Sequence, residues 1–191
     1  MSASQVSARP SAARERLLTT ASRLFYKEGI HTVGIDRVIA EAGVTRATFY
    51  RHFPAKQDLV VAYIQRRDEQ IRSVVAEAFK LPLKPREMLA LLMRGIADEV
   101  CGTGFRGCPF INAAAEYPDS DHPVRQAIRA HRDWFRQTIH NLVAASGHPE
   151  PDRATQLLVS FRDGAMAGGY LDDPQAASDS LTSVVDMVLA G

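Results

Sequence analysis

Apolar residues recur every three to four positions along almost the whole chain, and glycine or proline interrupts this pattern at short intervals. A period near 3.6 residues is typical of amphipathic helices, whereas the β-branched residues stand singly and form no alternating runs. The breaks predict an all-α fold of about nine helices. We expect these helices over residues 12–28, 35–42, 46–53, 55–81, 86–101, 108–117, 122–146, 152–170 and 174–190.

The first helix carries both of its expected end signals. Ser11 follows Pro10 and can cap the N-terminus, and Gly29 can end the helix in the left-handed conformation. The helix over residues 55–81 contains no glycine or proline, so it is long enough to connect two parts of the chain.

Charge is unevenly divided between the two ends of the chain. Residues 1–80 carry 13 Lys and Arg against 8 Asp and Glu, whereas residues 81–191 carry 10 against 14. A basic module joined to an acidic body is typical of a phosphate-binding head on a platform that does not bind nucleic acid. The longest apolar run, residues 59–64, is far too short to cross a bilayer, and we expect a cytoplasmic protein.

The most informative stretch is residues 29–59, which place two short helices around the turn Ala42-Gly43-Val44-Thr45. A tight turn with glycine lets the second helix cross the first and enter the major groove, as in a helix-turn-helix. One side of this unit is apolar, and the other carries hydroxyl, guanidinium and imidazole groups suited to phosphates and base edges. The apolar side comprises Ile35, Val38, Ile39, Ala42, Val44, Phe49 and Phe53.

These residues resemble the head of the TetR family of transcriptional repressors. The pattern runs through Ala21, Phe25, Gly29, the segment Ile39-Ala40-Glu41-Ala42-Gly43-Val44-Thr45, Tyr50, Phe53, Lys56 and Leu59. The match covers about residues 14–60; beyond it the resemblance lies in helix number and order. It implies a dimeric, ligand-responsive repressor that binds a palindromic operator and is released by a small-molecule inducer.

The resemblance also implies roles for single residues. Thr45, Tyr50 and Lys56 would contact phosphates, and the positions at or near the bases would be Arg46, Ala47, Thr48, Arg51 and His52.

The sequence departs from the family pattern in three places. Gly34 stands where Ser or Thr usually caps the second helix, so Thr32 is added as a compensating phosphate contact. Ala47 replaces a frequent glycine. Pro54 and Ala55 precede Lys56 without a capping hydroxyl, so we expect the fourth helix to lack a side-chain N-cap.

Together these features predict four segments. They are a flexible N-terminus (1–10), a helix-turn-helix DNA-binding domain (11–54), a connecting helix (55–81), and a ligand-binding and dimerisation domain (82–191).

The body contains large apolar residues that could line an inducer pocket, although a bundle core needs such residues in any case. The candidates are Met93, Ile96, Phe105, Phe110, Ile111, Trp134, Phe161 and Met166.

The last two helices carry wide apolar faces, which we expect to form a homodimer interface; an intrachain hairpin is the alternative. One helix-turn-helix reads one half-site of an operator. Reading the second half-site of a palindrome therefore requires a partner chain related by a two-fold axis. The expected interface comprises Leu157, Leu158, Phe161, Ala165, Gly168, Leu181, Val184, Val185 and Val188.

Two other functions are weighed. A helical di-iron enzyme needs two Glu-x-x-His pairs, and the single such spacing, Glu28 to His31, is interrupted by Gly29. No nucleophile motif or phosphate loop is present, so no enzyme, cofactor or metal is expected. An interaction bundle without DNA binding remains the other alternative. Cys101 and Cys108 are expected to be free thiols, and Cys108 at a helix start is a weaker candidate for redox sensing.

Overall fold

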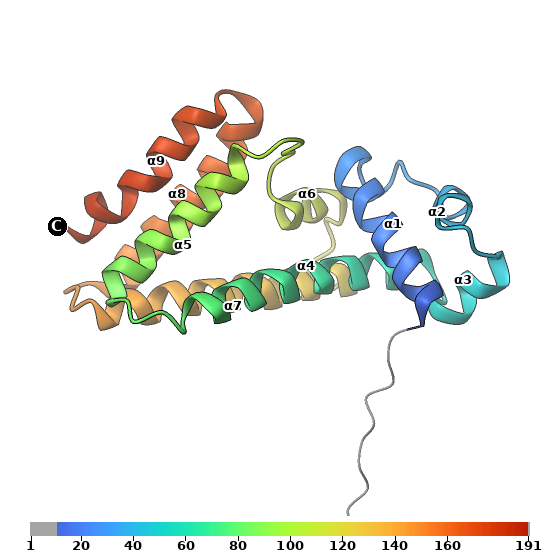
Figure 1. The fold of residues 1–191 in the computed structure, drawn as a ribbon, viewed down its shortest axis with the longest axis horizontal. Coiled ribbons are helices and arrows are strands. Elements are labelled where there is room, and N and C mark those ends of the chain that lie inside the picture. Colours follow the sequence, from blue (N-terminus) through green and yellow to red (C-terminus); the bar gives the residue numbers. More distant parts are fainter. Residues whose placement is uncertain (1–10, 191) are drawn as a thin grey trace, which may run out of the picture. The chain divides into compact units, whose positions relative to one another are not determined.

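The computed structural model describes residues 11–190, and these residues form nine α-helices and no strand (Figure 1). Contacts divide the chain into two compact units, residues 1–63 and 64–191. The expected flexible segment 1–10 lies outside the described residues. The helices are α1 Ala12–Glu28, α2 Ile35–Ala42, α3 Arg46–His52, α4 Lys56–Ala78, α5 Pro85–Val100, α6 Pro109–Glu116, α7 Pro123–Ala145, α8 Pro151–Leu171 and α9 Pro174–Leu189.

The first helix begins as expected but ends differently. The Ser11 hydroxyl accepts a hydrogen bond from the Arg14 N–H at 3.2 Å. At the other end, Gly29 has φ 92° and ψ 149°, so its φ is positive but its conformation is not the left-handed helical one. The extended ψ of Gly29 ends α1, and the chain turns at residues 30–32 before α2.

The turn between α2 and α3 depends on Gly43. This residue has φ 61° and ψ 45°, the left-handed conformation that glycine adopts without strain. Its N–H bonds to the carbonyls at the end of α2, and the Val44 N–H donates to the Ile39 carbonyl at 3.3 Å. The turn therefore caps α2 and directs the chain into α3.

A small apolar core fixes the first unit. Phe49 of α3 is fully buried, and Phe25 of α1 meets the Tyr63 ring edge-on at 5.8 Å. Fully burying one large apolar side chain stabilises a fold by roughly 1.5–3 kcal/mol, so Phe49 alone holds α3 firmly. The other buried members include Leu17, Leu18, Ala21, Leu24, Ile30, Val33, Val38, Ala42, Phe53, Leu59 and Val60.

Proline opens every helix from α5 to α9. Proline suits the first helical position because its fixed φ matches the helix and its missing N–H would have no partner there. These five prolines explain why the observed starts differ from the expected ones by no more than one residue.

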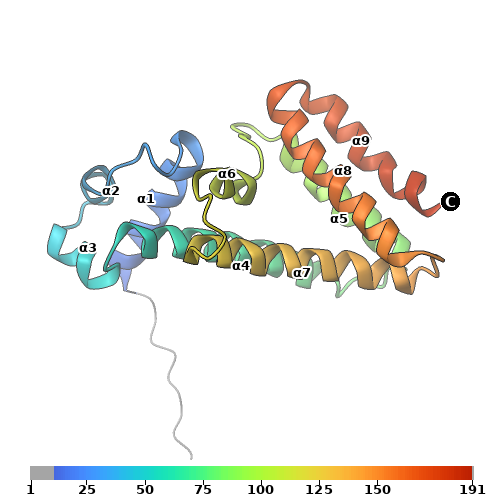
Figure 2. The same cartoon turned by 180° about the vertical axis from the view of Figure 1, so that it is seen from behind.

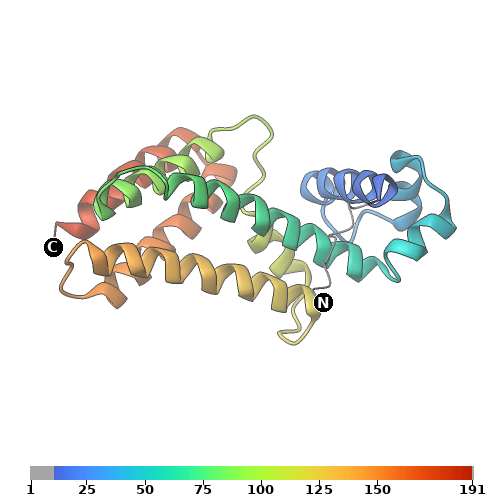
Figure 3. The same ribbon diagram turned by 60° about the horizontal axis from the view of Figure 1, so that its bottom comes forward.

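In the second unit, α9 packs closely against α5 and α8, and α7 packs against α8 (Figures 1 and 2). Gly169 of α8 lies so close to α5 that a Cβ atom there would stand 2.2 Å from Val100 Cγ1. The α4 segment of this unit runs beside α7 (Figure 3), where the Arg72 guanidinium donates to the Ala130 carbonyl.

The apolar stripe of α9 belongs to this core, which corrects the interface expected from the sequence. Leu181, Val184, Val185 and Val188 are at most 8% exposed in the single chain, and Leu158 of α8 is fully buried. Periodicity shows that one face of α9 is buried but not which element buries it. Here α5 and α8 bury it, so the intrachain alternative holds for these five residues.

Candidate nucleic-acid interface

A side-chain cap positions the start of α3. The Thr45 hydroxyl accepts a hydrogen bond from the Thr48 N–H at 3.1 Å and donates one to the Thr48 hydroxyl at 2.9 Å. This cap satisfies one of the free N–H groups of the first turn. It also holds both hydroxyls at the helix N-terminus, which attracts phosphate.

The polar residues of α3 lie opposite its buried side. Phe49 is fully buried, whereas the neighbouring Tyr50 is 43% exposed and crosses the Phe49 ring edge-on at 5.2 Å. The aromatic contact therefore holds the phenol ring against the core, while part of the side chain stays exposed. The remaining exposed or half-exposed positions are Thr45, Arg46, Ala47, Thr48, Arg51 and His52.

Two of these side chains have partners within the unit. Arg46 forms an ion pair with Asp36 in the first turn of α2, and both side chains are largely exposed. An exposed pair of this kind contributes about 0–1 kcal/mol, so a phosphate or base can displace Asp36 at low cost. His52 Nε2 lies 3.0 Å from the Ser11 hydroxyl, which links the end of α3 to the start of α1.

Lys56 opens α4 beside the helix-turn-helix. Its ammonium group lies 3.5 Å from the His31 carbonyl, so the side chain is held near the loop before α2. Ala55 precedes α4 and has no side chain that could cap the free N–H groups of the first turn. The Asp58 carboxylate reaches back and accepts from the Ala55 N–H at 2.8 Å, which is the reciprocal half of a capping box.

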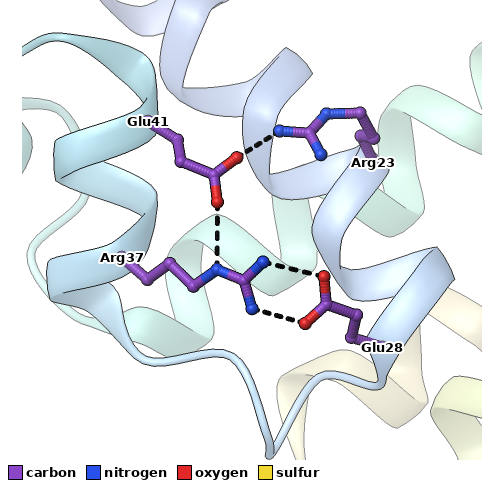
Figure 4. Close-up of polar contacts among 4 residues, drawn as sticks. All are labelled: Arg23, Glu28, Arg37 and Glu41. Atoms are coloured by element: carbon purple, nitrogen blue, oxygen red, sulfur yellow. Dashed lines mark hydrogen bonds and ion pairs between the residues drawn. The ribbon is translucent and has the colours of Figure 1, made fainter.

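An ion network joins α1 to α2 behind this surface (Figure 4). Arg37 forms ion pairs with both Glu28 and Glu41, and Glu41 also pairs with Arg23. Hydrogen bonds from Arg37 lower the pKa of Glu28, and those from Arg23 and then Arg37 lower the pKa of Glu41. The network keeps both carboxylates charged and fixes α2 relative to α1.

Similarity to known proteins decides the family. Residues 17–63 match the model described as "Bacterial regulatory proteins, tetR family", and residues 86–180 match "Tetracyclin repressor-like, C-terminal domain". A solved TetR-family transcriptional regulator from Streptomyces coelicolor is 49% identical, with a TM-score of 0.90 over 93% of this chain and 94% of that chain. The chain belongs to the TetR family of transcriptional regulators.

Curated relatives that are named as HTH-type transcriptional regulators match over shorter alignments. The HTH-type transcriptional regulator LmrA of Bacillus subtilis is 28% identical over 63% of this chain, and the HTH-type transcriptional activator FasR of Mycolicibacterium smegmatis is 28% identical over 78%. Each alignment spans 66% of the relative, just under two thirds of its length. The family, the all-α fold and the role in transcription regulation expected from the sequence are thereby confirmed.

The candidate ligand residues of this TetR-family body differ in their burial. Met93, Phe110 and Met166 are buried in the core, whereas Ile111 and Phe161 are 36% and 40% exposed. Intermediate burial applies to Ile96, Phe105 and Trp134.

An open groove of about 540 Å³ lies along α8 and α9, and Phe161 is the one candidate ligand residue that lines it. Small residues make up most of its other walls. They are Ser160, Gly164, Ala165, Gly168, Ala176, Ala177 and Ser180, with Asp172 and Asp173 at one end.

Sequence reasoning missed two groups of polar residues. The first is the Arg23, Glu28, Arg37 and Glu41 network, of which only the four-residue spacing from Arg37 to Glu41 was visible in the sequence. The second surrounds Arg162 of α8, a buried cation for which no local signal exists. Among residues 11–190 no helix is long and apolar enough to span a membrane, and no three potential ligands cluster as a metal site.

Proposed function

We propose that this TetR-family regulator binds a palindromic operator as a homodimer and represses transcription until a small molecule binds its body. The supporting observation is the surface of α3, where polar side chains from Thr45 to His52 face outward from a helix anchored by the buried Phe49. In this proposal residues 11–54 bind DNA, residues 55–81 connect the two parts, and residues 82–191 hold the effector and the partner. The protein acts in the cytoplasm, together with its DNA, as a regulator and not as an enzyme.

The DNA contacts divide into two classes. Thr45, Tyr50 and Lys56 hold phosphates, with Thr32 as a further contact in the exposed loop before α2. The positions that read bases are Arg46, Ala47, Thr48, Arg51 and His52. Phosphate contacts fix orientation, whereas base contacts carry the sequence preference.

The homodimer interface uses the outer faces of α8 and α9. Leu157 and Phe161 of α8 and Met187 of α9 are large apolar side chains, yet they are 42%, 40% and 63% exposed. The groove beside Phe161 is lined by small residues, which allow a partner helix to approach closely. Ala165 and Gly168 from the expected set belong to this surface, since both line the groove.

Effector binding is proposed to act through α4, which continues without interruption from Lys56 to Ala78. The effector must bind the DNA-competent and the released conformations with different affinity, because a ligand with equal affinity shifts no population. The inducer pocket is expected among Met93, Ile96, Phe105, Phe110, Ile111, Trp134, Phe161 and Met166.

Salt dependence tests the DNA-binding proposal directly. The affinity of the full chain for mixed-sequence duplex should fall with a log–log slope of about −0.9 for each phosphate neutralised. A duplex recovered by selection from random DNA should bind more tightly than the mixed sequence and carry two half-sites about 34–36 Å apart. A flat salt dependence would instead favour a protein-interaction bundle without DNA binding.

Transcription activation is the second candidate, since the FasR relative is named as an activator. A reporter gene that carries the selected operator distinguishes repression from activation. Loss of this protein should raise reporter expression if it represses and lower it if it activates.

A further inference from the structure

An ionic cluster around the buried Arg162 joins α7, α8 and the start of α6 in the second unit. Arg162 of α8 is 7% exposed, and its Nη1 lies 2.9 Å from Asp163 Oδ1 and 3.3 Å from Cys108 Sγ. The other Asp163 oxygen accepts a hydrogen bond from Arg132 of α7 at 2.7 Å. The cluster therefore contains two guanidinium groups and one carboxylate.

Asp163 stays ionised in this surrounding. Burial by itself would raise its pKa, but the hydrogen bonds from Arg132 and Arg162 outweigh burial and keep the pKa below its ordinary value. One negative charge then faces two positive charges. Asp68, the carboxylate that contacts α7 from α4, is already engaged by Arg72 and His131.

Arg162 also has an unused hydrogen-bond donor. Its Nε is buried and has no partner in the structure. A buried donor without an acceptor is unfavourable. An anion that accepts from Nε would remove this cost and would balance the second positive charge of the cluster.

The N-terminus of α6 lies at the same place. Cys108 is the N-cap residue, Pro109 occupies the first helical position, and no side chain caps the helix. The contact from Arg162 to the Cys108 sulfur therefore brings the guanidinium to the end of a helix whose dipole attracts negative charge.

We propose that Arg162 and the N-terminus of α6 bind the carboxylate of a small organic acid, and that this acid is the effector class of the body. The inference rests on the proposed effector-responsive function and adds the chemistry of the ligand. The apolar part of the acid packs beside Phe135, whose ring centre lies 5.4 Å from the Arg162 guanidinium carbon. Because Arg162 is nearly closed off, binding requires local rearrangement, and that requirement gives the ligand different affinities for two conformations.

The test uses benzoate, acetate and the neutral isostere benzamide with the full-length protein at constant ionic strength. In calorimetry and thermal unfolding, benzoate should bind the wild type and stabilise it. Acetate should bind and stabilise it more weakly. Benzamide should bind at least tenfold more weakly than benzoate. Arg162→Met should lose at least tenfold in benzoate affinity. Asp163→Asn should gain affinity, because it removes the competing negative charge.

Two controls keep the result interpretable if Arg162→Met unfolds. Arg153→Met removes an exposed arginine of α8 and should leave benzoate binding unchanged. Asp163→Asn keeps Arg162 and should bind benzoate more tightly than the wild type does. If it binds benzoate no more tightly than the wild type, the proposal is overturned.

DNA binding separates this inference from the proposed function. Benzoate binding that depends on Arg162 but leaves operator affinity unchanged would support the site and contradict effector control. Failure of both carboxylates to bind wild type and Asp163→Asn would overturn the site, while leaving DNA binding untouched.

Discussion

Neighbouring side chains on α3 have opposite surroundings, and this difference separates structural from functional residues. Phe49 is fully buried and Tyr50 is 43% exposed, although one peptide bond separates them. Burial assigns Phe49 to the core and leaves Tyr50, Arg46 and Arg51 available to a duplex.

Alanine variants of the α3 surface should divide into two groups. Tyr50→Ala and Lys56→Ala should weaken binding to all duplexes alike, and loss of the Lys56 phosphate contact should reduce the salt slope by about 1. Arg46→Ala, Thr48→Ala and Arg51→Ala should also alter sequence preference, at about 1–3 kcal/mol per lost base contact. Binding isotherms on the selected operator and on single-base variants measure both effects. Equal losses on every duplex from all five variants would contradict this division.

His131 should make stability depend on pH. The ring is 3% exposed and stacks on Phe110 at 3.6 Å, and burial lowers its pKa more than the hydrogen bond to Asp68 raises it. The unfolded chain then binds the proton more readily, so this contribution is complete above about pH 6.5 and is lost as the pH falls below that value.

Urea unfolding at pH 5.5, 6.5 and 7.5 measures this effect. His131→Gln should lose less stability on acidification than the wild type, whereas the control His148→Gln, in the α7–α8 loop, should behave like the wild type. Equal acid sensitivity of all three proteins would show that the pKa of His131 is the same in the folded and the unfolded chain, which contradicts the prediction.

At the level of single helices, local chemistry determines where each element begins and ends. A proline opens each helix from α5 to α9, and the hydroxyls of Ser11 and Thr45 cap α1 and α3. Gly34 begins α2 without any side-chain cap. The N-terminus of α2 is therefore uncapped, and a substitution at Gly34 can supply the missing side-chain cap.

Two glycine substitutions around α2 should have opposite effects. Gly34 has an extended conformation and no atom within 4 Å of the position that a Cβ would take, so Gly34→Ser should add a cap and stabilise the fold by a few tenths of a kcal/mol. Gly43 has equal space but a φ of 61°, so Gly43→Ala should cost about 1–2 kcal/mol through backbone strain. Thermal unfolding compares them. A stable Gly43→Ala protein would show that the turn can adopt another conformation.

For the whole molecule, assembly depends on which faces the single chain leaves uncovered. Leu158 and Phe161 stand three residues apart on α8, yet Leu158 is fully buried and Phe161 is 40% exposed. Substitutions at Leu158 should therefore affect folding stability, whereas substitutions at Phe161 should affect dimer formation.

Phe161→Glu should dissociate the dimer and leave the monomer folded, because it places a charge at the proposed interface on a side chain that is 40% exposed in the single chain. Leu158→Ala should cost about 2–5 kcal/mol of stability through a core cavity. Sedimentation and unfolding measure the two properties. A dimeric Phe161→Glu protein would mean that the partner binds elsewhere.

The sequence by itself determined the helices, because caps, proline starts and glycine ends act within a few residues. The spacing from Ala21 to Leu59 also sufficed for the family and for the placement of polar residues on α3. Only the tertiary structure decided which surfaces are free. Periodicity reveals that α9 has an apolar face, but α5 and α8, far away in sequence, cover it. The same holds for Arg162 and Cys108, which meet across 54 positions through helix packing that no local pattern encodes.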